Sequence, residues 1–74
     1  MKLLSELNVG ESCVVTKVCA TGKLRRRLFD MGITPGVSIS VKKLAPLGDP
    51  IEITIRGYEL SLRKDEANSV EVEI

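Results

Sequence analysis

The amino-acid sequence predicts a mainly β fold: a small barrel of about five short strands with one inserted α-helix and one or two short helical turns. Apolar and polar residues alternate in several short stretches separated by Gly or Pro, which is typical of half-buried strands. The chain has 74 residues, of which 43% are apolar, so it can hold one core, and we expect a single domain over residues 1–74. Short strands with one apolar face each bury that face by curling into a barrel.

The N-terminal segment is expected to form a helical turn and then a strand. Three leucines between residues 3 and 7 recur at near-helical spacing and predict a single turn that packs them on the core. The next stretch has apolar side chains at Cys13, Val15 and Val18. This order departs from a period of two, so we expect a strand over residues 13–20 with a β-bulge.

One clear helix follows this strand. Leu24, Leu28 and Met31 lie at i, i+4 and i+7 and form an apolar stripe that faces the core. Thr21 is suited to cap the N-terminus, and Gly32 is suited to end the helix in the left-handed conformation. The helix is therefore predicted between these two residues.

A sharp turn, a strand and a loop come next. The Thr-Pro-Gly sequence at residues 34–36 has the signature of a type II turn. Val37, Ile39 and Val41 then alternate with polar residues, which predicts a half-buried strand. Residues 45–50 contain two prolines and a glycine and are expected to form a loop.

The last part of the chain is predicted to be a hairpin, a short helical turn and a final strand. Apolar and polar residues alternate over 51–55 and 58–62, on either side of Gly57. Residues 64–68 are expected to make about one helical turn, and the alternation over 70–74 predicts the last strand. With the helix inserted after the first strand, these elements fit a small SH3-like barrel.

The residue types present argue against an enzyme. The sequence contains no His, which is both the commonest general base and the commonest nitrogen ligand for metals. It also lacks the glycine-rich phosphate loop and the nucleophile elbow. We therefore expect a non-enzymatic protein with no catalytic residues and no cofactor.

Neither a membrane span nor a signal peptide is expected. No apolar run approaches the roughly 18 residues that a span needs. The N-terminal segment is too short and too acidic for a signal peptide. The cytoplasm is the predicted location.

Basic residues crowd the exposed sides of the predicted helix. Such a patch suits a phosphate group or an acidic protein surface, and it is equally typical of a solvated helix face. The formal net charge of only +1 argues against a dedicated nucleic-acid binder. The two aromatic residues, Phe29 and Tyr58, are expected in the core, so nucleic-acid bases have no stacking platform. The helix residues and the basic residues expected nearby are Lys23, Arg25, Arg26, Arg27, Lys42, Lys43 and Arg63.

Carboxylates are the remaining candidates for binding a hard metal ion. Alternating carboxylates on a strand are more typical of a solvated face, and Asp before Pro is typical of a turn, so no metal site is predicted. The residues considered are Asp49, Asp65, Glu66, Glu71 and Glu73.

Two cysteines, Cys13 and Cys19, lie in one extended segment of about 20 Å. A disulfide needs Cα atoms within roughly 7 Å, so the two cannot pair unless the segment folds back. We interpret them as reduced, half-buried thiols.

Three blocks of the sequence together resemble the FeoA family, the small cytosolic companions of the bacterial ferrous iron transporter FeoB. The blocks appear in the order that the family shows, and the resemblance covers nearly the whole chain. They are RRRLFDMGITPG, which contains Leu28 to Gly36; the loop Ala45 to Ile51; and Gly57 with Leu60-Ser61-Leu62-Arg63 and Ala67.

The resemblance implies an SH3-like barrel and a role in ferrous iron uptake through contact with FeoB. Contact with the membrane would then be indirect, through the transporter. A similar barrel ends the iron-dependent repressors of the diphtheria-toxin-repressor type. This sequence begins with Met1 at the barrel and lacks DNA-binding helices, so it looks like the stand-alone form. The resemblance assigns no role to Cys13 or Cys19.

The leading hypothesis is a non-enzymatic adaptor that docks on the cytosolic part of FeoB. Two alternatives remain open: nucleic-acid or regulatory binding through the basic helix, and metal sensing by the carboxylates. Weak self-association through an edge strand is also left open. The residues expected to bind the partner are Arg26, Arg27, Leu47, Gly48, Asp49 and Pro50.

Overall fold

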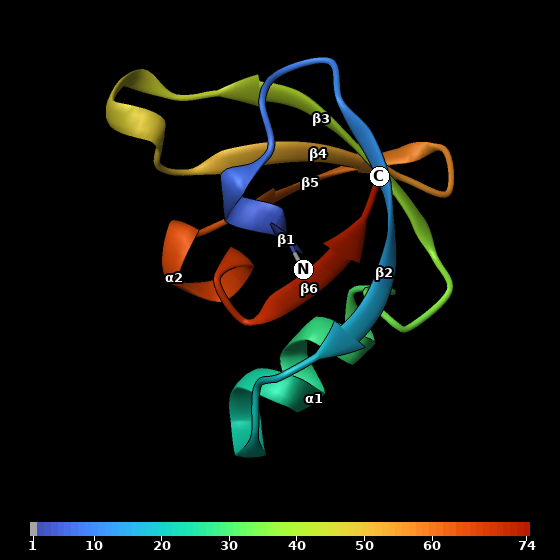
Figure 1. The fold of residues 1–74 in the computed structure, drawn as a ribbon. Helices are drawn as coiled ribbons and strands as arrows, with labels where there is room; N and C mark the ends of the chain where they lie inside the picture. The colour runs from blue at the N-terminus through green and yellow to red at the C-terminus, as the bar shows by residue number, and fades with distance from the viewer. Residues whose placement is uncertain (1) are drawn as a thin grey trace.

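A computed structural model describes residues 2–74 as a curled antiparallel sheet with its helical elements at the ends and sides (Figure 1). The sheet has six strands in the order β1-β6-β2-β3-β4-β5. The strands are β1 (Lys2–Leu3), β2 (Ser12–Val18), β3 (Ser38–Leu44), β4 (Ile51–Ile55), β5 (Tyr58–Leu62) and β6 (Val70–Glu73). The helical elements are η1 (Leu4–Glu6), α1 (Gly22–Asp30), η2 (Pro46–Gly48) and α2 (Lys64–Ala67).

The predicted β-bulge in β2 is confirmed. The pairing of β2 with β6 shifts register between Val15 and Lys17, which is where the apolar period of two breaks. A second shift lies in β3, between Val41 and Lys43. The N-terminal leucines do not all belong to one turn, because Lys2–Leu3 pairs with β6 as an additional short strand before η1 begins.

Two turns have the conformations that their residues favour. Gly36 has φ of +95°, and the Val37 amide donates to the Thr34 carbonyl (3.2 Å), as in a type II turn. In the β4–β5 hairpin, Arg56 (φ +50°) and Gly57 (φ +84°) both have positive φ, as a type I′ turn requires.

The ends of α1 agree only in part with the prediction. Gly32 follows the helix with φ of +92°, as predicted. Thr21 occupies the N-cap position, but its side chain makes no capping hydrogen bond. Gly22, the first helical residue, has φ of +60°.

The core is almost entirely aliphatic and is built from the inward faces of the strands together with α1 and α2. Ile53, Ile55 and Leu28 are fully buried. The prediction that Tyr58 is a core residue is wrong. Its ring is 43% exposed, because its hydroxyl reaches across to donate to the Met31 carbonyl at the end of α1 (2.7 Å).

The last strand is one residue shorter than predicted. β6 ends at Glu73, and the side chain of Ile74 is 68% exposed, whereas Val70 and Val72 are buried. The alternation of apolar residues in the sequence therefore extends one residue beyond the end of the strand.

Candidate partner-binding surface

The loop between β3 and β4 carries the most exposed apolar side chain described. The Ala45 amide donates to the Pro50 carbonyl (3.1 Å), and the Gly48 amide donates to the Ala45 carbonyl (2.8 Å), so the loop is closed by its own backbone. Leu47 lies at its tip with φ of +71° and is fully exposed. A leucine in a left-handed conformation that buries nothing is held in place by the loop at a cost in stability.

The other predicted residues of this loop position the tip. The Asp49 carboxylate accepts a hydrogen bond from the Lys64 amide at the first turn of α2 (3.0 Å). This bond ties the loop to an element 15 residues further along the chain. The Asp49–Pro50 peptide is cis, and Pro50 and Gly48 are both half-buried. Of the four predicted loop residues, Leu47 alone projects freely from the surface.

The two arginines predicted on α1 have different surroundings. Arg26 is exposed and lines a small cleft of about 330 Å³, beside the Arg25 guanidinium that stacks over the Phe29 ring (4.7 Å). The Arg27 guanidinium instead pairs with the Glu66 carboxylate of α2 (3.4 Å). Glu66 is only 8% exposed, so Arg27 neutralises a nearly buried charge and joins the two helices.

Replacing Arg27 by alanine is therefore expected to destabilise the fold by about 1 kcal/mol, since the nearly buried Glu66 carboxylate loses its cationic partner. Arg26→Ala is the matched control and should change stability by less than about 0.5 kcal/mol. Urea unfolding of the two variants measures the difference. Equal stabilities would show that the Arg27–Glu66 pair contributes nothing.

The structure does not bring the predicted residues into one surface. In Figure 1, the 45–50 loop and α1 lie at opposite ends of the curled sheet. The expected clustering of Lys42 and Lys43 with the helix is also wrong. Both lie in the half of β3 that leads to the loop, and Lys42 forms an ion pair with Glu59 of β5. Leu47 and Arg26 therefore belong to two separate candidate surfaces.

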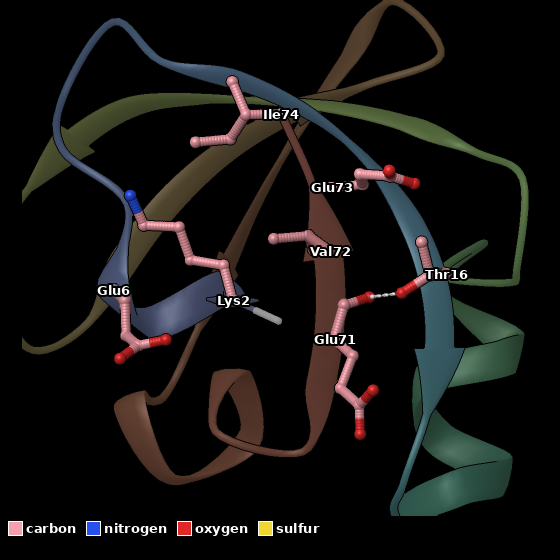
Figure 2. A pocket seen from close by; sticks show the side chains of 7 residues that line it. All are labelled: Lys2, Glu6, Thr16, Glu71, Val72, Glu73 and Ile74. Atoms are coloured by element: carbon pink, nitrogen blue, oxygen red, sulfur yellow. Dashed lines mark hydrogen bonds between the residues drawn. The ribbon is translucent and has the colours of Figure 1, made fainter.

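A larger groove, of about 740 Å³, lies over β6 between η1 and β2 (Figure 2). Lys2 and Glu6 line it on one side, Thr16 on the other, and residues 71–74 run along it. The alternating glutamates of this segment are visible in the sequence. As expected for the solvated face of a strand, Glu73 is exposed and Glu71 is half-buried.

The two cysteines are both free, as expected, but their surroundings differ. Cys13 is buried on the core side of β2, and burial together with the nearby Glu11 charge raises the pKa of its thiol. Cys19 is exposed rather than half-buried. Its thiol donates to the Glu71 carboxylate (2.8 Å), and this hydrogen bond is the main reason that the pKa of Cys19 is raised.

Cys19 is consequently expected to react slowly with iodoacetamide near neutral pH, because the thiolate forms only at higher pH than in a free cysteine. Glu71→Gln removes the carboxylate that favours the protonated thiol, so the pH profile of the labelling rate should shift to lower pH. The measurement is made in a Cys13→Ala background to isolate one thiol. An unchanged profile would contradict the role given to Glu71.

No metal site or membrane span is found in the part of the chain that the structure describes. Within residues 2–74, no three His, Cys, Asp or Glu side chains form a group that could hold a metal ion. None of the helices described there is long and apolar enough to cross a membrane. Of the carboxylates considered above, Asp49, Glu66 and Glu71 each accept a hydrogen bond within the protein.

A family model described as the FeoA domain matches residues 2–74. This chain belongs to the FeoA family. The FeoA chain is 41% identical over 71 residues to the Fe(2+) transport protein A/Fe(2+) transporter FeoB fusion protein of Porphyromonas gingivalis. That alignment covers 96% of this chain but only 8% of the fusion protein.

Solved structures of relatives have the same fold as this chain. Iron(II) transport protein A of Clostridium thermocellum superposes with a TM-score of 0.95 at 38% identity, over 99% of this chain and 45% of that one. A zinc complex of Stenotrophomonas maltophilia FeoA, described as a prokaryotic SH3 domain protein, superposes with a TM-score of 0.86 at 30% identity. The superposition covers 99% of this chain and 91% of that one. The SH3-like fold predicted from the sequence is confirmed.

The barrel is also found as part of larger proteins. A manganese-dependent transcriptional repressor in complex with manganese superposes with a TM-score of 0.90 over 97% of this chain and 35% of its own. Its identity to the FeoA chain is only 19%, so the likeness extends to the fold alone.

Proposed function

We propose that this FeoA chain is a non-enzymatic adaptor in ferrous iron uptake that docks on the cytosolic part of the transporter FeoB. The observation that carries the proposal is the Porphyromonas gingivalis relative, in which a homologous segment and FeoB are parts of one polypeptide. Domains fused in one species commonly act together when they are separate chains in another. The Stenotrophomonas maltophilia relative, described as a candidate activating factor for ferrous iron transport, is consistent with this role.

Leu47 is the residue that we assign to the centre of the contact. It is fully exposed and apolar, and it is held at positive φ by a loop whose ends are hydrogen bonded to each other. Such strain in a residue that makes no internal contact is typical of a functional position. Burying one leucine side chain in a partner contributes about 1.5–3 kcal/mol to binding, which is enough to make it an anchor.

Arg26 and its neighbours on α1 form a second, electrostatic surface. Arg25 and Arg26 line the cleft on the helix, and both guanidinium groups are free of carboxylate partners within residues 2–74. Rim charges of this kind act mainly on the rate of association and on its salt dependence. We therefore assign Arg26 to steering an acidic surface of the transporter and Leu47 to holding it.

The test is a pull-down of the tagged chain with detergent-solubilised FeoB from the same source, with and without guanine nucleotide. Retention of FeoB supports the adaptor role, and dependence on nucleotide would place the contact near the nucleotide-binding part. Absence of FeoB under all conditions would refute it. Arg26→Glu should slow association at low salt and lose its effect at high salt.

A further inference from the structure

Strand β5 forms one end of the sheet and pairs with β4 alone (Figure 1). The two strands are joined by the type I′ turn at residues 56–57, so the Tyr58 amide faces the Ile55 carbonyl. Backbone groups in an antiparallel strand alternate between its two sides, so every second residue from Tyr58 onward bonds toward β4. Glu59 and Ser61 therefore direct their amides and carbonyls away from the sheet.

The pairing on the other side of the sheet gives the same alternation. The amide and the carbonyl of Val41 both bond to residues 10–11, on the side of β3 that faces away from β4 (2.9 and 2.8 Å). Its neighbour Ser40 then bonds toward β4, to its partner Thr54. The backbone groups of Thr54 are thus turned away from β5, and those of Glu59, which lies opposite Thr54, point outward.

This outer edge of β5 is exposed and lacks the features that usually protect an edge strand. Glu59 and Ser61 are exposed, and nothing else within residues 2–74 bonds to their backbone groups. Residues 58–62 contain no Pro or Lys, and their pairing with β4 has no bulge. The charge of Glu59 is paired with Lys42. The strand is therefore open to pairing with another chain.

We propose that β5 pairs with β5 of a second copy of this chain in an antiparallel dimer, with Leu60 on the two-fold axis. Glu59 of each copy then lies opposite Ser61 of the other. Each of these pairs exchanges two backbone hydrogen bonds, as opposed residues with facing backbone groups do. All the outward amides and carbonyls of residues 59 and 61 thereby obtain a partner.

The two neighbouring two-fold registers leave some of these groups unpaired. With Ser61 on the axis, Glu59 would face Arg63, whose amide and carbonyl are already bonded within the first turn of α2 (2.9 and 3.0 Å). With Glu59 on the axis, Ser61 would face Gly57, which lies in the turn. The register with Leu60 on the axis is the one that β5 fits.

Side chains in this register are complementary on both faces of the strand. On the core side, the half-buried Leu60 meets its own copy, and Tyr58, which is 43% exposed, faces Leu62. On the solvent side, the Ser61 hydroxyl faces the Glu59 carboxylate of the other copy, so no two like charges are opposed. An extended segment of another protein would have to supply these matches by its own sequence, whereas a second copy carries them already.

The dimer is tested with the chain alone, so the result is independent of whether the chain binds FeoB. The isotope-labelled chain is followed by NMR from about 0.05 to 2 mM, because pairing of one five-residue strand buries little surface and gives a weak complex. Amide signals of residues 58–62 should shift with concentration, and sedimentation velocity should show a dimer. A chain that stays monomeric at the highest concentration, or shifts centred on α1 or on the 45–50 loop, would overturn the proposal.

Two substitutions of Ser61 test the register. Ser61→Glu opposes a like charge to Glu59 of the second copy, whereas Ser61→Lys opposes a charge of the other sign. The first should weaken association and the second should strengthen it, each by about two- to tenfold. Ser38→Glu, at an exposed position of β3 inside the sheet, makes the same change in charge as Ser61→Glu and should leave association unchanged. Equal association of the two Ser61 variants, or an equal loss in Ser38→Glu, would contradict pairing through β5.

Discussion

Replacing Leu47 by glycine is expected to make the protein more stable and at the same time to weaken its binding to FeoB by about tenfold or more. The stability rises by about 1 kcal/mol, because glycine adopts the φ of +71° without the steric cost that leucine pays. The side chain is fully exposed, so its removal opens no cavity. Binding falls because the partner loses the burial of one leucine side chain.

The two effects are measured separately, by urea unfolding and by titration of immobilised FeoB. Arg56→Gly is the matched control. Within residues 2–74, Arg56 is the other residue with positive φ that is not glycine, and it lies in the β4–β5 turn. It should show a similar gain in stability with full binding. If Leu47→Gly binds FeoB as well as the parent chain does, the tip of the loop is not the anchor.

Replacing Gly32 by alanine is expected to destabilise the fold by about 2–3 kcal/mol. Gly32 has φ of +92°, which costs an alanine about 1–2 kcal/mol. The added Cβ would also lie only 2.9 Å from the Tyr58 hydroxyl oxygen, so that hydroxyl must move away from the Met31 carbonyl to which it donates. The loss of this hydrogen bond adds about 1 kcal/mol.

A double-mutant cycle separates the two causes. Tyr58→Phe removes the hydroxyl that the new Cβ would meet, so Gly32→Ala should cost about 1 kcal/mol less in that background. Gly10→Ala has a similar φ of +91° with no atom within 4 Å of the added Cβ, and it should show the backbone cost alone. Additive effects of the two changes, measured by urea unfolding, would contradict a direct clash.

The elements of the fold could be predicted from local patterns because each depends on residues close together in the chain. Alternation over residues 51–62, the helical stripe at Leu24, Leu28 and Met31, and the turn at residues 34–36 need no distant partner to form. The break in the period near Val15 likewise predicted the bulge. Closure into a barrel followed from having too few residues for a second layer.

The candidate site was predicted less well, because the role of a polar side chain depends on which distant residue it meets. Arg26 and Arg27 are neighbours of the same type, yet only Arg27 reaches the nearly buried Glu66, 39 positions away. Asp49 is predicted from the sequence to lie in a turn and to bind the partner, but its carboxylate accepts a hydrogen bond from the Lys64 amide at the start of α2. Nothing in the sequence around these residues indicates that either pair is close together in the folded protein.

The sequence by itself determined the strands, the helix, the turns and the membership of the family. Tertiary structure alone decided which predicted residues are free to bind and placed β1 beside β6 in the sheet. The physical reason is the distance along the chain between the residues that interact. Backbone conformation and the apolar period are set by near neighbours, whereas the pairing of β1 with β6 brings together residues about 70 positions apart.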